Sequence, residues 1–386
     1  MTPTVDWAPR AQALAADLRA KNAIRSDAVA HAIEAVPRHL FIKGHYATGH
    51  HTAVDPAQPT DELLDLAYAD RGIMTHTPAD DADGFSSTSQ PSIVAKMLEA
   101  ARLRPGMRVL EVGAGTGWNA ALIAHITSAQ TNTVEASPLV AAEAREALAR
   151  AGAQRVTVHT GDGYLGHRDS GPYDLIIVTC GITGISLAWL DQLSPHGTIL
   201  APIAHGGLHP LTRIITSEGG PTGQLVASAD FMTATGPLYS GATPSPATCG
   251  QHFATPDPAV SRIGVVPADL DPRGSYVDLW MHLAARQAGT TCAGAKDTSD
   301  YTGCAVVDDA SAVFVQPGGL HLTPGPEAEL LADQVQQHVS EWDHNGRPEL
   351  TAWQCSLVPA GDTDHPLLAP AYWRLATGSD PAHEHM

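Results

Sequence analysis

Residues 108–119, RVLEVGAGTGWN, decide the fold that this sequence predicts. A short apolar run leads into a turn with glycine at every second position, and the apolar residues 120–124 after it predict a helix. Gly113, Gly115 and Gly117 allow the backbone to turn tightly and to approach a ligand closely. A strand, a glycine-rich turn and a helix in this order predict the first segment of a doubly wound α/β sheet.

The acidic residue before the turn, Glu111, indicates the charge of the ligand. Turns that bind phosphate use lysine or bare helix N–H groups, and a carboxylate at this place would repel a phosphate. A carboxylate beside a glycine turn suits a cationic or zwitterionic ligand with an amino-acid end. S-adenosyl-L-methionine (SAM) is such a ligand, and we expect it here.

The segments that follow continue the same pattern. Residues 132–134 predict a second strand that ends in Glu135, where a doubly wound sheet holds ribose hydroxyls. Residues 155–159 predict a third strand, and the GDG turn at 161–163 after it offers a carboxylate to an adenine amino group. Residues 173–180 predict a fourth, fully buried strand. Each segment alone is common in α/β proteins, but together and in this order they predict a SAM-binding sheet.

The composition is that of a folded, acidic protein. Its 386 residues, of which 43% are hydrophobic, suffice for a sizeable core and for more than one domain. The formal net charge of −19 argues against a general affinity for nucleic acid or anionic membranes, which attract basic surfaces. We therefore expect a small molecule or a peptide as the partner, with no nucleic acid and no membrane.

The cysteine pattern favours a reducing compartment. The cysteines are odd in number and form no C-x-x-C pair, so we expect free thiols at Cys180, Cys249, Cys292, Cys304 and Cys355. A bond between Cys292 and Cys304, or a metal shared by them, is an alternative that no matching His/Cys spacing supports. His45, His50 and His51 are expected in a solvated loop, so no metal site is predicted. With no apolar leader and no bilayer-length apolar segment, the sequence predicts a cytoplasmic protein.

Composition also divides the chain into four parts. Residues 1–85 predict N-terminal helices and a substrate-side loop, with Ser26 as the N-cap of the second helix. Residues 86–235 form the predicted SAM-binding core, and residues 236–259, rich in Gly, Pro, Ser and Thr, predict a linker. Residues 260–386 predict an added α+β domain, which we expect to recognise the substrate.

A run of hydroxyl side chains, SSTSQP at residues 86–91, opens the helix before the first strand. Ser89 is expected as the N-cap of that helix, since a hydroxyl followed by a residue that proline holds extended is typical of a cap. Near the glycine turn the same hydroxyl can donate to a substrate carboxylate, which the positive end of a helix favours. The residues alone leave both roles open.

These elements are also found, in the same order, in one enzyme family. They are VPR at 36–38 with Phe41, Tyr68 with Asp70, TSQP at 88–91 with Val94, VLEVG at 109–113, GDG at 161–163, and Tyr173-Asp174 with Ile176-Ile177. Over residues 1–235 the sequence resembles the protein-L-isoaspartate O-methyltransferases, and the Ser-Gln-Pro element at this distance from the glycine turn is specific to that family among SAM enzymes.

The resemblance implies a class I SAM-dependent methyltransferase with a Rossmann-like doubly wound sheet. Such an enzyme transfers a methyl group from SAM to the α-carboxylate of an isoaspartyl residue or to a related aspartyl carboxylate, and releases S-adenosyl-L-homocysteine. Carried onto this sequence, it implies that Ser89 contacts the substrate carboxylate with Thr88 beside it. It further implies substrate contacts at Ser87, Gln90, Tyr68 and Asp70.

The resemblance also implies a set of cofactor residues. The methionine part of SAM is assigned to Glu111, Gly113, Ala114, Gly115, Thr116, Gly117 and Asn119. The ribose is assigned to Glu135 and Ala136, and the adenine to Gly161, Asp162 and Gly163. The end of the fourth strand contributes Thr179 and Cys180.

The implied chemistry needs no general base. A carboxylate with a pKa of about 4 is already ionised at neutral pH, and a sulfonium methyl is already activated. The task of the enzyme is alignment, which can lower a barrier by about 7–11 kcal/mol. The ester that forms loses methanol when the next backbone amide attacks it, which gives a succinimide (aspartimide) without further catalysis.

The chain departs from the compact repair enzymes of the family at three places. It continues to residue 386, its loop at 75–85 is long and acidic, and its fourth strand ends in Cys180-Gly181-Ile182-Thr183. The departures favour a dedicated substrate, as in family members that convert a chosen Asp in a modified ribosomal precursor peptide (lanthipeptide, graspetide or lasso peptide). General isoaspartate repair, methylation of another carboxylate and a catalytically silent SAM-binding scaffold are the alternatives. A nucleic-acid methyltransferase is not expected, since the strand end lacks an Asn/Asp-Pro-Pro-aromatic element.

Overall fold

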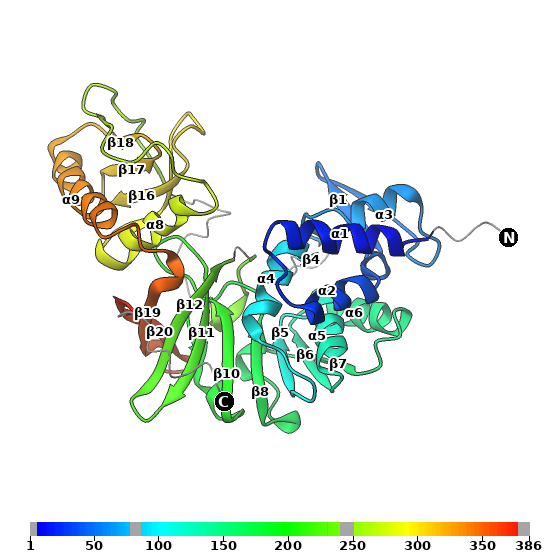
Figure 1. The fold of residues 1–386 in the computed structure, drawn as a ribbon. Helices are drawn as coiled ribbons and strands as arrows, with labels where there is room; N and C mark the ends of the chain where they lie inside the picture. The colour runs from blue at the N-terminus through cyan, green and yellow to red at the C-terminus, as the bar shows by residue number, and fades with distance from the viewer. Residues whose placement is uncertain (1–5, 78–85, 230, 240–250, 377–386) are drawn as a thin grey trace. The chain divides into compact units, whose positions relative to one another are not determined.

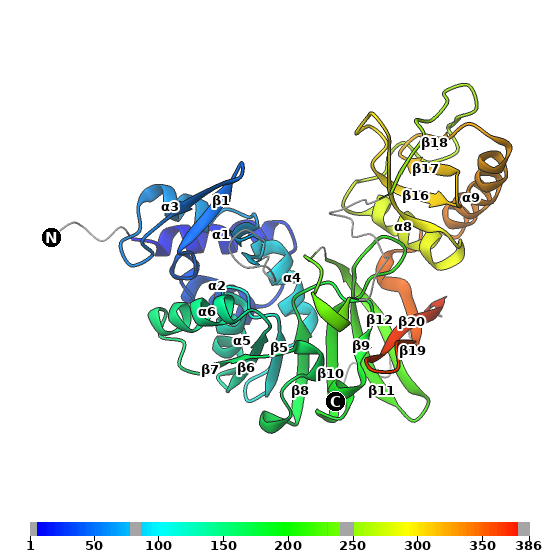
Figure 2. The same ribbon diagram turned by 180° about the vertical axis from the view of Figure 1, so that it is seen from behind.

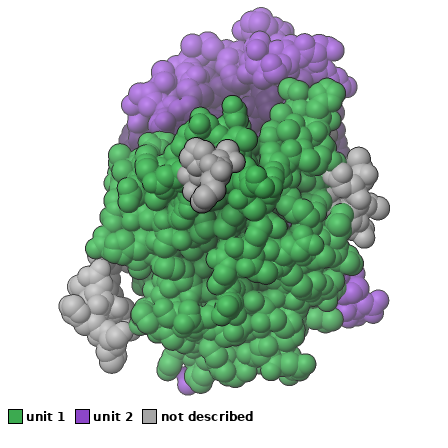
Figure 3. Space-filling model, turned by 90° about the vertical axis from the view of Figure 1, so that its right-hand side faces the viewer, with its two compact units in different colours: residues 1–180, 186–201 green, residues 181–185, 202–386 purple. Residues whose placement is uncertain are grey.

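The computed structural model describes residues 6–77, 86–229, 231–239 and 251–376 (Figures 1 and 2). The chain forms two compact units, Met1–Cys180 with Ser186–Ala201 and Gly181–Ile185 with Pro202–Met386 (Figure 3). The short strand β9 (Ile185–Ser186) straddles this division. None of the helices in the described ranges combines the length and the apolar composition that a bilayer crossing requires.

The first unit contains N-terminal helices, two hairpins and a parallel sheet. The elements before the sheet are α1 (Ala8–Ala20), α2 (Asp27–Ala35), η1 (Arg38–Phe41), β1 (Gly44–Ala47), β2 (His50–Ala53), α3 (Asp61–Ala67), β3 (Ile73–His76), β4 (Ser86–Thr88) and α4 (Pro91–Ala101). The sheet and its connections comprise β5 (Val109–Val112), α5 (Trp118–Thr127), β6 (Thr131–Glu135), α6 (Pro138–Arg150), β7 (Val156–Thr160), η2 (Gly163–Leu165), η3 (Arg168–Ser170), β8 (Tyr173–Val178), α7 (Leu187–Leu190) and β10 (Leu193–Pro202).

The strands of this sheet are parallel and follow the order β7-β6-β5-β8-β10. All four residues of β5 are buried, because a parallel sheet is covered on both faces. This explains why every residue of the strand except Glu111 is apolar. The chain runs outward from β5 through β6 to β7 and then returns to β8 on the other side of β5. The strand order therefore reverses between β5 and β8, and ligands bind at the carboxyl ends of strands at such a point.

The four predicted strands are confirmed as β5, β6, β7 and β8. Ser26 caps α2 as predicted, since its side chain accepts the N–H of Val29. The prediction that Ser89 caps α4 is wrong: Gln90 stands at the N-cap and makes no capping side-chain bond. The carboxylate of Asp70 instead accepts the Ser92 N–H at 2.9 Å, so the helix end is capped from a distant segment.

The segment before α4, predicted to be irregular, contains two antiparallel hairpins. β1 pairs with β2, and β3 pairs with β4 with Ile73 opposite Thr88. Thr75 and His76, predicted in a loop, belong to β3, and the acidic residues 80–83 lie outside the described residues. The pairing places β4 and its hydroxyl side chains at a fixed register.

The second unit is α+β, and it includes residues 210–228, which the sequence places in the SAM-binding core. Its elements are β11 (Pro210–Ser217), β12 (Gly220–Ser228), η4 (Gly236–Leu238), β13 (Gln251–Phe253), β14 (Arg262–Ile263), α8 (Ser275–Arg286), β15 (Thr290–Ala295), β16 (Gly303–Val307), β17 (Ala312–Gln316), β18 (Gly319–Leu322), α9 (Pro326–His344), η5 (Leu350–Ala352), β19 (Trp353–Gly361) and β20 (Pro366–Leu375). Within it, β11, β12, β19 and β20 form an antiparallel succession, and six strands form a separate sheet in the order β13-β15-β16-β17-β18-β14.

Helices α8 and α9 pack on one apolar core in this unit. The buried residues of α9 recur every three or four positions, which places them on one face of the helix: Ala328, Ala332, Val335, Val339 and Trp342. Trp342 and Trp353 are fully buried, as expected for core residues. Burial of each large apolar side chain contributes about 1.5–3 kcal/mol, so these two helices are firmly held against each other.

The expectation of five free thiols is wrong at Cys292, and Cys249 lies outside the described residues. Cys292 is disulfide-bonded, whereas Cys180, Cys304 and Cys355 are free. Cys304 lies opposite Cys292 in the β15–β16 pair but is not its partner. Spacing along the sequence failed to indicate the bond, because a disulfide depends on which strands and loops meet in the fold.

Candidate functional site

The turn at residues 113–117, which we call the glycine turn, joins β5 to α5 at the carboxyl end of the sheet. Gly113 has φ +97°, and a Cβ at this residue would lie 2.6 Å from Oγ1 of Thr179. That hydroxyl donates to the Gly113 carbonyl at 2.5 Å, so the residue after β8 holds the turn after β5. Glycine is required here both by the backbone conformation and by this contact.

Glu111 lies at the end of β5 and is fully buried. Its Oε1 accepts the side-chain amide of Asn119 at 2.7 Å, and its Oε2 accepts the Thr133 hydroxyl at 2.6 Å. Burial raises the pKa of this carboxyl to about 7 in spite of the two donors. The Oδ1 atom of Asn119 is buried and has no partner among the described residues. A carboxylate and an unpaired amide oxygen side by side fit an ammonium group.

Glu135, at the end of β6, holds two backbone segments. Its Oε2 accepts the Gly115 N–H at 3.0 Å and its Oε1 accepts the Ser137 N–H at 3.2 Å. Burial raises the pKa of this carboxyl as well, while the backbone donors lower it. Each carboxylate oxygen has a second lone pair, so Glu135 can accept ligand hydroxyls while it holds the glycine turn.

The turn after β7 meets the same edge of the sheet. The Gly161 N–H donates to the carbonyl of Glu135 at 2.9 Å. The Asp162 side chain accepts the Tyr164 N–H at 2.8 Å and thereby caps η2. The Gly163 carbonyl accepts the indole N–H of Trp189 at 2.9 Å. These bonds fix the turn that carries the Asp162 carboxylate next to the end of β6. The structure thus brings together the predicted cofactor residues at the ends of β5, β6, β7 and β8.

The thiol of Cys180 is free and lies close behind Thr179. Burial, together with the nearby carboxylates of Glu135 and Glu111, raises its pKa to about 12. The thiol therefore stays protonated at neutral pH and is no nucleophile. Cys180 therefore acts as a small, neutral side chain near the carboxylates of Glu135 and Glu111.

Residues 86–92, which we call the serine element, lie against the glycine turn. A Cβ at Gly115 would be 3.4 Å from the Ser87 carbonyl and 3.7 Å from the Ser86 hydroxyl. The hydroxyls of Ser86 and Thr88 are buried and have no hydrogen-bond partner in the described part of the chain. Ser87, between them, points to the other side of the strand, as alternation requires. Ser86 was missed in the sequence, although period-two alternation pairs it with Thr88.

Arg38 holds the backbone of the serine element through hydrogen bonds from its guanidinium group. It is fully buried and donates to the carbonyls of Ser89 at 2.9 Å, Arg71 at 3.0 Å and Ala67 at 2.6 Å. Burial lowers the pKa of the guanidinium to about 9, and its carbon lies 5.0 Å from the centroid of the Trp118 ring. In the sequence Arg38 stood out only as part of a shared motif, and nothing there indicated these contacts.

Three predicted substrate residues have partners inside the protein. The Tyr68 hydroxyl lies 3.1 Å from Nδ1 of His39, and Tyr68 is buried. Asp70 accepts from Ser92 and, at 3.3 Å, from Lys21. The Gln90 side chain donates to the Ser92 hydroxyl at 2.9 Å. These contacts support the serine element, so in this structure the three residues position it instead of facing a substrate.

A cavity of 310 Å³ adjoins both elements. Ser86 lines it from the serine element and Gly115 and Thr116 line it from the glycine turn. Its other walls carry charged and aromatic side chains, among them Phe41, Lys43, His76, Glu143 and Arg150. His76 is paired with Glu143 at 3.0 Å. The cavity gives room for a polar group next to the unpaired Ser86 hydroxyl.

With this geometry in place, similar proteins can be compared. Residues 9–237 match the family model of protein-L-isoaspartate(D-aspartate) O-methyltransferase. A protein-L-isoaspartate O-methyltransferase of Pyrococcus horikoshii is 37% identical over 206 residues, 53% of this chain and 82% of the relative. The corresponding protein of Hyperthermus butylicus is 38% identical over 207 residues, 51% of this chain and 76% of the relative.

A solved protein-L-isoaspartate O-methyltransferase has the same fold over most of the chain. It aligns with 94% of this chain and with 100% of its own, with a TM-score of 0.52 and 22% identity. The family model ends at residue 237, so the likeness in fold extends into the second unit.

Proposed function

Since the chain belongs to the protein-L-isoaspartate(D-aspartate) O-methyltransferase family, we propose that it esterifies the carboxylate of an isoaspartyl or aspartyl residue in a peptide or protein. It is an enzyme of the SAM-dependent methyltransferase class, and its cofactor is SAM. The observation that carries the choice of substrate is that the hydroxyls of Ser86 and Thr88 are buried without a partner among the described residues, with Ser86 beside Gly115 of the glycine turn.

The residues at the sheet edge fit the cofactor. SAM supplies an activated methyl group when bound. Glu111 and the unpaired Oδ1 of Asn119 hold the ammonium end, since opposite charge and two acceptors stabilise it. Glu135 accepts the ribose hydroxyls and Asp162 the adenine amino group, while the backbone of residues 113–117 and the end of β8 at Thr179 and Cys180 form the wall of the site.

The serine element orients the substrate carboxylate. A carboxylate oxygen accepts from a hydroxyl at about 2.5–2.7 Å, and Ser86, Thr88 and Ser89 offer three such donors on adjoining positions of the chain. The carboxylate is ionised at neutral pH, so no side chain needs to remove a proton. Arg38 fixes the backbone of Ser89, and the burial of the Ser86 and Thr88 side chains limits the access of water to the carboxylate that they would contact. These residues supply alignment and exclusion of water.

We further propose that the substrate is a modified ribosomal precursor peptide, of the lanthipeptide, graspetide or lasso type, in the cytoplasm. Two features support this. The net charge of −19 favours a cationic stretch of peptide, and the end of the fourth strand, Cys180-Gly181-Ile182-Thr183, differs from the repair members that the sequence otherwise resembles. General repair of isoaspartyl proteins is the second candidate, favoured by the fold shared with a solved isoaspartate methyltransferase over 94% of the chain.

One mass-spectrometric assay separates these candidates. The full chain and SAM are incubated with a generic isoaspartyl peptide, with the same peptide carrying normal Asp, and with the modified precursor peptide encoded beside the gene. Esterification of the isoaspartyl peptide alone supports repair. Esterification of the precursor followed by loss of methanol supports biosynthesis. If no peptide is esterified while SAM binds, the chain is a silent scaffold and the proposed activity is wrong.

A further inference from the structure

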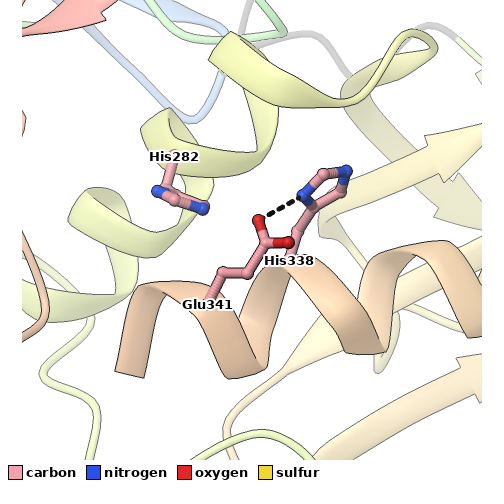
Figure 4. A group of neighbouring side chains, drawn as sticks. All are labelled: His282, His338 and Glu341. Atoms are coloured by element: carbon pink, nitrogen blue, oxygen red, sulfur yellow. Dashed lines mark hydrogen bonds and ion pairs between the residues drawn. The ribbon is translucent and has the colours of Figure 1, made fainter. Parts of the chain in front are cut away.

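Three side chains of the second unit converge between α8 and α9: His282, His338 and Glu341 (Figure 4). One nitrogen of each imidazole and one carboxylate oxygen lie within 4.8 Å of one another. Nδ1 of His338 is 3.2 Å from Oε2 of Glu341. The two residues stand three positions apart on α9 and therefore share one face of the helix, which the packing of the helices turns toward His282.

His282 is the residue that points to a ligand. It is 1% exposed, and neither of its ring nitrogens has a hydrogen-bond partner among the residues that the structure describes. The nearest ring is the indole of Trp353, with centroids 5.7 Å apart in an edge-on arrangement. A neutral imidazole carries one N–H donor and one lone pair, and buried polar groups are almost always paired. Burying a polar nitrogen without a partner costs free energy, and a ligand bound to one nitrogen of His282 would remove most of that cost.

We propose that His282, His338 and Glu341 bind a divalent transition-metal ion of the zinc type. Two imidazoles and one glutamate are a donor set that zinc takes in three-ligand sites with an open fourth position. Calcium and magnesium take oxygen ligands, so the two nitrogen donors select against them. Zinc at about 2.0–2.1 Å from each donor atom keeps the donor atoms about 3.4 Å apart. In the structure these atoms lie within 4.8 Å of one another, and rotation of the side chains can bring them to the shorter distance.

The surroundings suit such an ion. The side chain of His338 is 20% exposed and that of Glu341 is 40% exposed, so the fourth position faces solvent while His282 closes the inner side. The Gln337 side chain donates to Oε1 of Glu341 at 2.9 Å and orients the carboxylate. Such outer bonds position metal ligands. The ion would join α8 to α9 and uses residues of the second unit alone.

Metal binding to the full, tag-free chain tests the proposal. Co²⁺ is added first, because its visible absorption reports nitrogen and oxygen ligands, and Zn²⁺ is then added to displace it. We expect one equivalent of Co²⁺ with a ligand-field band that Zn²⁺ removes. His282→Ala and, separately, Glu341→Gln should weaken Co²⁺ binding about a hundredfold and at least tenfold, respectively.

Two controls isolate the site. His344→Ala removes another histidine of α9 outside the cluster, and a double variant, His383→Ala with His385→Ala, removes the histidines near the end of the sequence. Both should keep the full equivalent of Co²⁺. The proposal is overturned if the unaltered chain shows no ligand-field band. It is also overturned if Glu341→Gln and His282→Ala, shown to be folded by their circular dichroism spectra, bind Co²⁺ as the unaltered chain does. Loss of binding in the double variant alone would assign the metal to the tail instead.

Discussion

The two sides of the candidate active site are held together in different ways. On the cofactor side, the carboxylates of Glu111 and Glu135 accept from neighbours on the same sheet edge, all within residues 111–137. On the substrate side, the serine element is held by Arg38 and Asp70, which come from earlier segments of the chain. The cofactor side is thus a preformed, locally encoded surface, whereas the substrate side depends on long-range contacts that position a few unpaired hydroxyls.

If that difference holds, replacing Arg38 should impair peptide binding and folding more than any other change considered below. Arg38→Lys keeps the charge but loses the fork that reaches five backbone carbonyls, and leaves buried acceptors unpaired. We expect the free energy of unfolding to fall by about 3 kcal/mol. We also expect KM for the peptide to rise at least tenfold while the Kd for SAM changes little. Chemical denaturation and steady-state kinetics measure both quantities.

Arg262→Lys is the matched control, because Arg262 also contacts several acceptors, on Gln336, Glu329 and Asp333, but from a partly exposed position in the second unit. Its effect on unfolding should stay below about 1 kcal/mol. Equal losses in the two variants would show that Arg38 has no special role in holding the serine element.

Gly113 offers the corresponding test of the cofactor side. Gly113→Ala places a Cβ 2.6 Å from Oγ1 of Thr179 at φ +97°, so the turn must shift. We expect a loss of stability of about 1–3 kcal/mol and at least tenfold weaker SAM binding. Gly106→Ala has a similar φ of +86° but meets no atom within 4 Å, so it measures the conformational strain alone. If calorimetry gives both variants the SAM affinity of the unaltered chain, the turn does not shape the cofactor site.

Glu111 predicts a pH dependence. Its folded pKa is raised to about 7 by burial, above the ordinary value, so its protonated form stabilises the fold below about pH 4.5 and that contribution is lost as pH rises through 7. The ionised form binds an ammonium group, so SAM affinity should rise by roughly tenfold between pH 6 and 8. Glu111→Gln should flatten both profiles and weaken binding at pH 8. A slope in SAM affinity that persists in Glu111→Gln would assign it to another group.

The smallest expected effect on stability belongs to Thr88. Thr88→Val keeps the shape and removes a buried hydroxyl that has no partner among the described residues, so the fold should be unchanged or more stable by up to about 1 kcal/mol. The kcat/KM for the peptide should fall about tenfold, since the hydroxyl is needed only with substrate. Thr216→Val makes the same change at an exposed position of β11, outside the site, so as the control it should change neither value. Loss of stability in Thr88→Val would indicate a structural role for the hydroxyl.

The same contrast explains what the sequence could predict. The glycine turn, the strand ends at Glu111 and Glu135 and the Ser26 cap depend on residues a few positions apart, and all were predicted. The cap of α4 by Asp70, the buried fork of Arg38 and the disulfide at Cys292 join distant segments, and none was predicted. His282 and Glu341 meet only because α8 packs on α9, so spacing gave no sign of a metal site.

The most direct test of the central claim, that the serine element orients a carboxylate for methyl transfer, is a comparison of Ser89→Ala with the unaltered chain. The measurement is the initial rate of methyl ester formation at saturating SAM, on a peptide that the assay above identifies as a substrate. The Kd for SAM is measured in parallel. The account predicts a rate at least tenfold lower with the Kd for SAM unchanged. An unchanged rate, or a loss explained entirely by weaker SAM binding, would contradict it.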